Sequence, residues 1–177
     1  MTHILVTTGP ESSGKTTLAT DLSVALRVAL VPEQARGYLN QLYRIRPAGS
    51  YQQQDLLEIA RLQVAAEQQS LTAGTASMVC DTDLLVIVIW SEVKYGQCEP
   101  ELLRLFERSL QSHPRTYLLC DPSMPWEPDP LRENPNDRQA LHQRYQEKLE
   151  LWQLPFRSMR GTPAARLDSA LGLLDRT

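Results

Sequence analysis

The chain has 177 residues, 42% hydrophobic and 22% charged, which favours one domain over residues 1–177. Its formal net charge is −3 and it has no dense run of Lys and Arg, which argues against nucleic-acid binding. The longest apolar run, 84–90, is too short to cross a membrane and the N-terminus carries no secretory signal, so we expect no membrane partner. The three cysteines form no CxxC pair, which gives little support to a zinc site and is typical of reduced thiols in a cytoplasmic protein.

Apolar runs and helical patterns alternate from one end of the sequence to the other. In chain order, the spacing of apolar residues predicts a strand over 4–7, a helix over 16–27, a strand over 29–31, helices over 33–43 and 52–71, a strand over 77–80, helices over 84–90 and 100–110, a strand over 115–120, a helix over 138–152, a strand over 156–159 and a helix over 163–175. Residues 84–90 are ambiguous, because their β-branched side chains favour a strand whereas their place after an aspartate suits a helix; we predict a helix.

Alternating strands and helices are typical of a parallel sheet covered by helices on both faces. We therefore predict an α/β fold in three layers, with a five-stranded parallel sheet in the middle. Ligands of such sheets bind at the carboxyl ends of the strands. Residues that directly follow predicted strands are therefore the candidates for a functional site.

The sequence Gly-Pro-Glu-Ser-Ser-Gly-Lys-Thr follows the first predicted strand and matches the pattern G-x-x-x-x-G-K-[ST] without a departure. Glycines at both ends of this loop let the backbone come close to phosphate oxygens, and the amides of the loop turn inward to cradle them. An amphipathic helix follows, as the motif requires. We predict that the triphosphate of a nucleotide is bound by Gly9, Glu11, Ser12, Ser13, Gly14, Lys15, Thr16 and Thr17.

Charged and hydroxyl side chains complete the predicted phosphate site. Lys15 reaches the β- and γ-phosphates, and the Thr16 hydroxyl is a ligand of Mg²⁺. Asp81 ends an apolar run, where a carboxylate that supports the metal belongs in a P-loop protein, although an aspartate there also suits the N-cap of the next helix. Asp83 caps that helix or bonds to substrate, and the sequence leaves this open.

Glu33 follows the second predicted strand. A carboxylate at this place can accept the proton of a substrate hydroxyl while the γ-phosphoryl group departs. The alternative is an acid that stabilises the start of a helix through the helix dipole. One turn later, Arg36 pairs either with Glu33 or with substrate.

Five prolines within 121–137 exclude a regular element, and we predict a lid over about 121–138. Its arginines, Arg132 above all, can neutralise the charge that spreads over the phosphates in the transition state. The alternative is an exposed loop with ordinary solvated ion pairs. Trp126 and Tyr51 are candidates for stacking on a flat ring, although such aromatics more often serve as packing anchors.

The segments GPESSGKTTLA, PEQARGYL, VCDTDLL and YLLCDPSMPWEPDPLREN together resemble one family. It is the ribosylnicotinamide kinase domain of the bacterial trifunctional NAD-biosynthesis regulator, with its stand-alone AAA/P-loop kinase-like relatives, and the resemblance spans about residues 4–161. It implies a P-loop NTPase fold of the nucleotide-kinase type and the phosphorylation of the 5′-hydroxyl of nicotinamide riboside by ATP. Members of that family usually hold a tryptophan where this chain has Pro32. The resemblance supports Gly14, Lys15, Thr16, Asp81 and Arg132.

These observations predict a kinase that uses ATP and Mg²⁺ to phosphorylate a small molecule such as nicotinamide riboside. The predicted catalytic residues are Lys15, Glu33, Asp81 and Arg132, and the predicted metal ligands are Thr16 and Asp81. The alternative is a regulatory ATPase or switch that acts on a protein partner without a small acceptor. A GTPase has less support, because no N-K-x-D motif is present. The sequence does not indicate an oligomeric state.

Overall fold

Strands and helices alternate along the chain as the sequence pattern predicts. The computed structural model describes residues 2–72, 77–129 and 136–174. Its elements are β1 (His3–Thr8), α1 (Lys15–Leu26), β2 (Ala29–Val31), α2 (Gln34–Leu42), α3 (Gln53–Thr72), β3 (Ser77–Asp81), α4 (Leu84–Tyr95), α5 (Pro100–Ser112), β4 (Arg115–Cys120), α6 (Arg138–Leu151), β5 (Phe156–Met159) and α7 (Pro163–Leu174). Every predicted element within these residues is present, with ends shifted by at most two residues, except that the helix predicted over 84–90 continues to Tyr95.

The strands form a parallel sheet in the order β2-β3-β1-β4-β5 within the described residues. The chain order reverses at β1, which lies between β3 and β4. Thr7 of β1 stands beside Asp81 of β3 in the register, so the segments that follow these two strands leave the sheet at the same edge. This is the edge at which parallel α/β sheets bind ligands.

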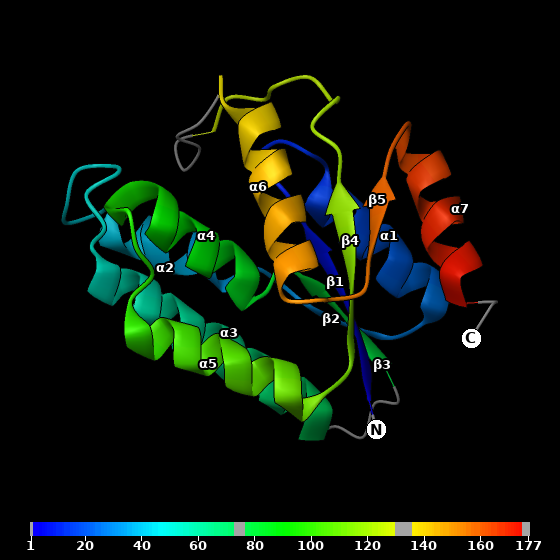
Figure 1. Cartoon of the computed structure of the whole chain (residues 1–177), viewed down its shortest axis with the longest axis horizontal. Coiled ribbons are helices and arrows are strands. Elements are labelled where there is room, and N and C mark those ends of the chain that lie inside the picture. Colours follow the sequence, from blue (N-terminus) through cyan, green and yellow to red (C-terminus); the bar gives the residue numbers. More distant parts are fainter. Residues whose placement is uncertain (1, 73–76, 130–135, 175–177) are drawn as a thin grey trace.

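Helices cover both faces of the sheet, which gives the predicted three layers (Figure 1). On one face, α1 and α7 pack on a cluster that includes Leu5 and Val79. On the other face, α2 to α6 pack on a larger cluster that includes Ile4 and Val6. Neighbouring residues of β1 thus alternate between the two cores, as side chains of a strand must.

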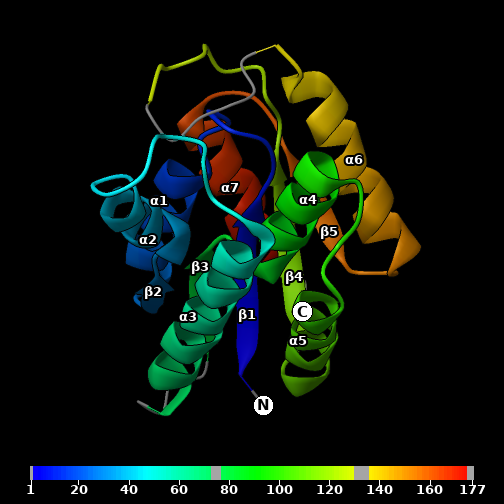
Figure 2. The ribbon, with the colours of Figure 1, turned by 90° about the vertical axis from the view of Figure 1, so that its left-hand side faces the viewer.

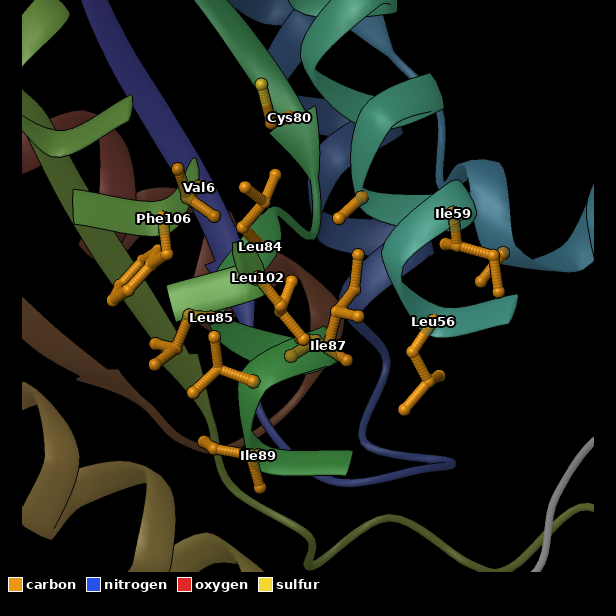
Figure 3. Close-up of a cluster of buried hydrophobic side chains, with 14 of the residues drawn as sticks. Val6, Leu56, Ile59, Cys80, Leu84, Leu85, Ile87, Ile89, Leu102 and Phe106 are labelled. Carbon is orange, nitrogen blue, oxygen red and sulfur yellow. The ribbon is translucent and has the colours of Figure 1, made fainter. Parts of the chain in front are cut away.

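Helix α4 lies inside the larger core, and its side chains from Leu84 to Ile89 are all buried. Figure 3 shows several of them between Leu56 and Ile59 of α3 and Phe106 of α5. A helix surrounded by protein is apolar on all sides, which explains why this segment resembles a strand in the sequence. It extends past the predicted end at Trp90 to Gly96, which caps it in the left-handed conformation. No helix of the described residues is long and apolar enough to span a membrane.

Candidate active site

A cavity of about 420 Å³ lies where the strands end. The loop between β1 and α1 forms one wall, and residues of α2, α4 and α6 form the opposite one. Met124, Pro125 and Glu127, which follow β4, contribute a third wall. In Figure 2 the segment after β4 passes above the loop between β1 and α1. The cavity therefore brings together segments that are far apart in the sequence.

The loop from Gly9 to Gly14 has a backbone that requires glycine at both ends. Gly9 has a φ of 131°, and a Cβ there would lie 2.8 Å from the carbonyl oxygen of Cys120. Gly14 has a φ of 80°, and a Cβ there would lie 2.7 Å from the sulfur of Met124. Both conformations lie in the region that residues with a side chain rarely adopt. A residue with a side chain at either position would therefore be strained, and the approach of this backbone to phosphate stays a prediction.

Helix α1 begins at Lys15 and points its N-terminus into the loop. Its N-cap is Gly14, so no side chain caps the first amides. The first turn of a helix presents N–H groups and a positive dipole end, which together bind anions. Lys15 donates a hydrogen bond of 2.7 Å from Nζ to the carbonyl of Pro10, and Thr16 and Thr17 line the cavity. The loop therefore combines the free amides of a helix start with the cation of Lys15, which is the arrangement that an anion-binding site needs.

Arg166 of α7 holds the phosphate loop in place, and no pattern in the sequence indicated this contact. Its side chain is almost fully buried, with 1% exposed. The guanidinium donates hydrogen bonds to the carbonyls of Ser13, Asp121 and Gly161, which belong to three different segments. Apolar spacing in 163–175 predicts the helix, but it carries no sign that an arginine of this helix faces inward.

Glu33 lies at the N-cap position of α2 and lines the cavity. Its side chain makes no capping hydrogen bond, but its place at the start of α2 is also the place where a negative charge interacts favourably with the helix dipole, so both roles stay open. Burial raises the pKa of this carboxyl above its usual value, the positive charge of Lys15 opposes the rise, and the negative charge of Asp81 adds to it. A carboxylate with a raised pKa is a stronger proton acceptor. Arg36 pairs with Asp129 at 2.9 Å rather than with Glu33.

Asp81 is buried at the end of β3, with 5% exposed. Its carboxylate accepts a long hydrogen bond of 3.5 Å from the Thr7 hydroxyl, and in the described part of the chain no cation forms an ion pair with it. Asp83, in contrast, caps α4 through the amide of Leu85 and accepts a hydrogen bond from the hydroxyl of Tyr117. The two aspartates therefore differ: Asp83 caps a helix and pairs with Arg115 at 3.3 Å, whereas Asp81 is a buried carboxylate that forms no ion pair with another described residue.

The residues present fit a Mg²⁺ ion that is bound together with a triphosphate. Buried carboxylates are normally paired or coordinate a metal, and Asp81 has no such pair. Within the described residues no three His, Cys, Asp or Glu side chains form a metal cluster. Magnesium does not need one, because it is usually held by one or two protein ligands together with substrate phosphates and water.

Apolar and aromatic side chains line the part of the cavity that faces Glu33. They are Leu39 of α2, Val86 and Trp90 of α4 and Tyr145 of α6. The sequence does not distinguish these four side chains, because apolar spacing gives no sign of which residues of a buried helix reach a cavity. The aromatics predicted for ring stacking do not line the cavity: Tyr51 packs under Lys94, whose Nζ lies 3.3 Å from the ring centre, and Trp126 lies near Arg138.

The predicted lid is described for residues 121–129 and 136–138, and Arg132 lies outside the described residues. The segment is joined to the phosphate loop through Ser12. The Ser12 hydroxyl donates to the carbonyl of Pro125 at 3.3 Å and accepts from the amide of Glu127 at 2.9 Å. Arg138 donates to the carbonyls of Ser12 and Met124. The lid segment is therefore docked on the loop.

A parallel sheet of this strand order, with an anion-binding loop between β1 and α1, defines a P-loop protein with a nucleotide-kinase-like fold. The sequence comparison gives the family. Residues 4–166 match the family described as AAA domain, and the chain belongs to it. No curated protein matches the sequence.

Solved structures similar to this chain have the same kind of fold. The NadR protein in complex with NAD and AMP-PNP superposes with a TM-score of 0.73 at 16% identity, covering 99% of this chain and 49% of NadR; NadR in complex with NR gives 0.72 at 17% identity, with 99% and 51% covered. Deoxyadenosine kinase from M. mycoides gives 0.69 at 13% identity, and thymidylate kinase from Ehrlichia chaffeensis gives 0.69 at 12%, each with 98% and 100% covered. The chain thus spans about half of NadR and the full length of the two kinases.

Proposed function

We propose that this chain is an ATP- and Mg²⁺-dependent kinase that phosphorylates the 5′-hydroxyl of a nucleoside such as nicotinamide riboside. One observation carries the proposal: a single cavity joins the phosphate loop to a pocket of apolar and aromatic side chains, with the Glu33 carboxylate on its wall. A nucleotide switch needs the phosphate loop alone. A kinase also needs a place for the acceptor beside the γ-phosphate, and this cavity has room for one.

The phosphate loop binds the nucleotide in this proposal. The amides at the start of α1 and the ammonium group of Lys15 bind the β- and γ-phosphates, and Lys15 exchanges its hydrogen bond to Pro10 for the phosphate oxygens. Thr16 and Asp81 hold Mg²⁺, which neutralises phosphate charge. Arg132, which the Pro-rich segment predicts as a lid residue and the resemblance supports, adds positive charge as the transition state forms.

Glu33 accepts the proton of the acceptor hydroxyl. The acceptor oxygen forms a bond to the γ-phosphorus, the bond from that phosphorus to the bridging oxygen of ADP breaks, and the hydroxyl proton passes to the Glu33 carboxylate. The burial that raises the pKa of Glu33 also strengthens it as a base. The carboxylate must be ionised when the acceptor binds, and the charge of Lys15 favours that form.

The acceptor is proposed to be a nucleoside because the pocket suits a flat ring carried on a polar sugar. Trp90 and Tyr145 offer aromatic rings, and Leu39 and Val86 offer apolar contact. Pro32 stands where the resembling family has a tryptophan, and the ring of Trp90, from a different element, can replace that surface. The sequence resemblance and the similarity to a NadR structure in complex with NR support nicotinamide riboside as the first acceptor to test.

The test is a coupled assay of ADP release over a panel of nucleosides and vitamins that includes nicotinamide riboside. We expect ADP release to depend on one class of acceptor and its phosphorylated product to appear in equal amount. Slow ATP hydrolysis that is the same with every acceptor would reject the kinase and favour a regulatory ATPase. Without any heat of binding for ATP or GTP in magnesium buffer, the P-loop assignment itself would fail.

A further inference from the structure

Gln63 of α3 is a buried amide between two segments of the candidate site. Its side chain is 2% exposed. The Oε1 atom accepts a hydrogen bond of 3.3 Å from the backbone amide of Gln34, the residue after Glu33. The Nε2 atom donates a hydrogen bond of 3.4 Å to the carbonyl of Thr82, the residue after Asp81. One side chain thus connects the segments that carry the proposed proton acceptor and the proposed metal ligand.

The orientation of the Gln63 amide is set by Glu67, one turn further along α3. Nε2 of Gln63 donates to Oε1 of Glu67 at 3.5 Å, and Oε2 of Glu67 pairs with Arg115 at 2.7 Å. An ionised carboxylate can only accept hydrogen bonds. The NH₂ group of Gln63 therefore faces Glu67 and Thr82, which leaves the amide oxygen for Gln34.

Thr82 shows why the segment after β3 needs such support. Its φ is 68°, in the left-handed region, which is a strained conformation for a β-branched residue. Strain of this kind persists only where surrounding contacts hold the backbone. Two contacts do so here: the Thr82 amide donates to the carbonyl of Thr7 at 3.1 Å, and the Thr82 carbonyl accepts from Gln63.

We propose that Gln63 is a positioning residue that sets the place of Glu33 relative to Asp81. This inference rests on the proposed function. Gln63 and Glu33 also line the same small cavity of about 10 Å³, whereas Gln63 is not among the residues that line the large cavity. It acts through the backbone of its two neighbours and does not touch the acceptor. A displacement of about 1 Å in such a site costs as much as a hundredfold in rate.

The first test compares Gln63→Met with Gln68→Met. Methionine keeps the length of the buried side chain and removes its hydrogen bonds, and Gln68 is an exposed glutamine of the same helix. We expect Gln63→Met to lower kcat by about ten- to a hundredfold with the acceptor KM within twofold, and Gln68→Met to change neither. A rise in acceptor KM with kcat intact would overturn the proposal, since Gln63 would then contact the acceptor, and so would an unchanged kcat.

A second measurement uses no acceptor. The affinity for ADP is measured by calorimetry with and without Mg²⁺, and we expect the gain from Mg²⁺ to be several-fold smaller in Gln63→Met because Asp81 has moved. An unchanged gain would overturn the role at Asp81. If the wild type phosphorylates no acceptor, the proposed function fails, and this measurement alone then decides the role of Gln63.

A variant outside the core covers the case in which Gln63→Met does not fold. Gln34 is the first residue of α2, a position where proline is well tolerated, and Glu33 before it has a ψ of 120°, which is compatible with a following proline. Gln34→Pro removes the N–H that bonds to Gln63, and Gln34→Ala keeps it. We expect the loss of kcat in Gln34→Pro alone. Equal kcat values in the two variants would contradict the proposal.

Discussion

The ammonium group of Lys15 has a hydrogen-bond partner in the loop itself, the carbonyl of Pro10. Its charge also acts on Glu33 across the cavity. We expect Lys15→Ala to lower kcat/KM by about 10²–10³-fold, or roughly 3–4 kcal/mol of transition-state stabilisation, by analogy with the loss of one donor to a developing charge. Steady-state kinetics check this, with Lys94→Ala as a control cation outside the cavity. Phosphoryl transfer within a few-fold of the wild type would count against the role of Lys15.

The Glu33 carboxyl predicts a pH dependence. Its pKa in the folded protein is raised by burial above the usual 4.5, and the base is active only when ionised. The rate should therefore fall as the pH drops through this raised pKa, so that the acidic limb lies above pH 4.5. The pH profile of kcat/KM checks this. Glu33→Gln should lose the limb and about 10²–10⁴-fold of the rate, and a limb that persists in this variant would assign it to another group.

Among the elements, the lid segment and the phosphate loop are coupled through the Ser12 hydroxyl, which bonds to both Pro125 and Glu127. We expect Ser12→Ala to loosen the segment, because loss of a hydrogen bond costs about 1 kcal/mol. Hydrogen exchange at the Glu127 amide should become about fivefold faster, with exchange in β1 unchanged. Equal exchange rates at Glu127 in the variant and the wild type would show that other contacts hold the lid.

The sequence predicted the elements well because two periodicities alternate along it. Strands and helices near the sheet have distinct apolar spacings, so their type was correct and only their ends moved. The type of helix α4 could not be assigned from apolar spacing, because Leu84 to Ile89 are all buried and the helix has no polar face there to mark its period. Its type followed from its place after β3, and its end at Gly96 depends on a glycine that the apolar pattern does not include.

The site was predictable where its residues form a local motif or lie at the end of a strand, as Glu33 and Asp81 do. The phosphate loop is a local motif, so its position and helix were correct. Trp90 and Tyr145, which are more than fifty residues apart in the sequence, reach the cavity from two different helices, and Arg166 reaches the loop from α7. Hydrophobic patterns indicate that a helix is buried but not which side chain faces a cavity. Arg132 remains a prediction from the Pro-rich segment and the resemblance.

At the scale of the whole molecule, a buried ion pair joins α3 to β4. Arg115 and Glu67 lie 2.7 Å apart with side chains 3% and 5% exposed. Arg115 also pairs with Asp83 at 3.3 Å, and removal of the arginine leaves two buried carboxylates, so we expect Arg115→Met to lower the free energy of unfolding by about 3 kcal/mol. Glu58→Gln breaks an exposed pair with Arg61 and should cost less than about 1 kcal/mol. Urea unfolding of both variants checks this, and equal losses would contradict it.

Nucleotide binding should stabilise the whole fold, because the loop joins elements from both ends of the chain. With a non-hydrolysable ATP analogue and Mg²⁺ at about 100 times Kd, the gain is about 2.7 kcal/mol, or a rise in Tm of roughly 5–11 °C for a chain of this size. Thermal unfolding checks this. Chelation of Mg²⁺ with EDTA should reduce the rise, and the same rise in Lys15→Ala would contradict the phosphate-binding role of the loop.

The hydrogen bonds from Arg166 to Ser13 and Asp121 also have a consequence for biosynthesis. The ribosome delivers the phosphate loop before Arg166, which lies 153 residues beyond Ser13. A nascent chain can pair β1 with β3 and β4 before α7 emerges, but its loop then lacks the guanidinium that fixes its carbonyls. We therefore expect a chain that stops before Arg166 to form the sheet with a less rigid phosphate loop.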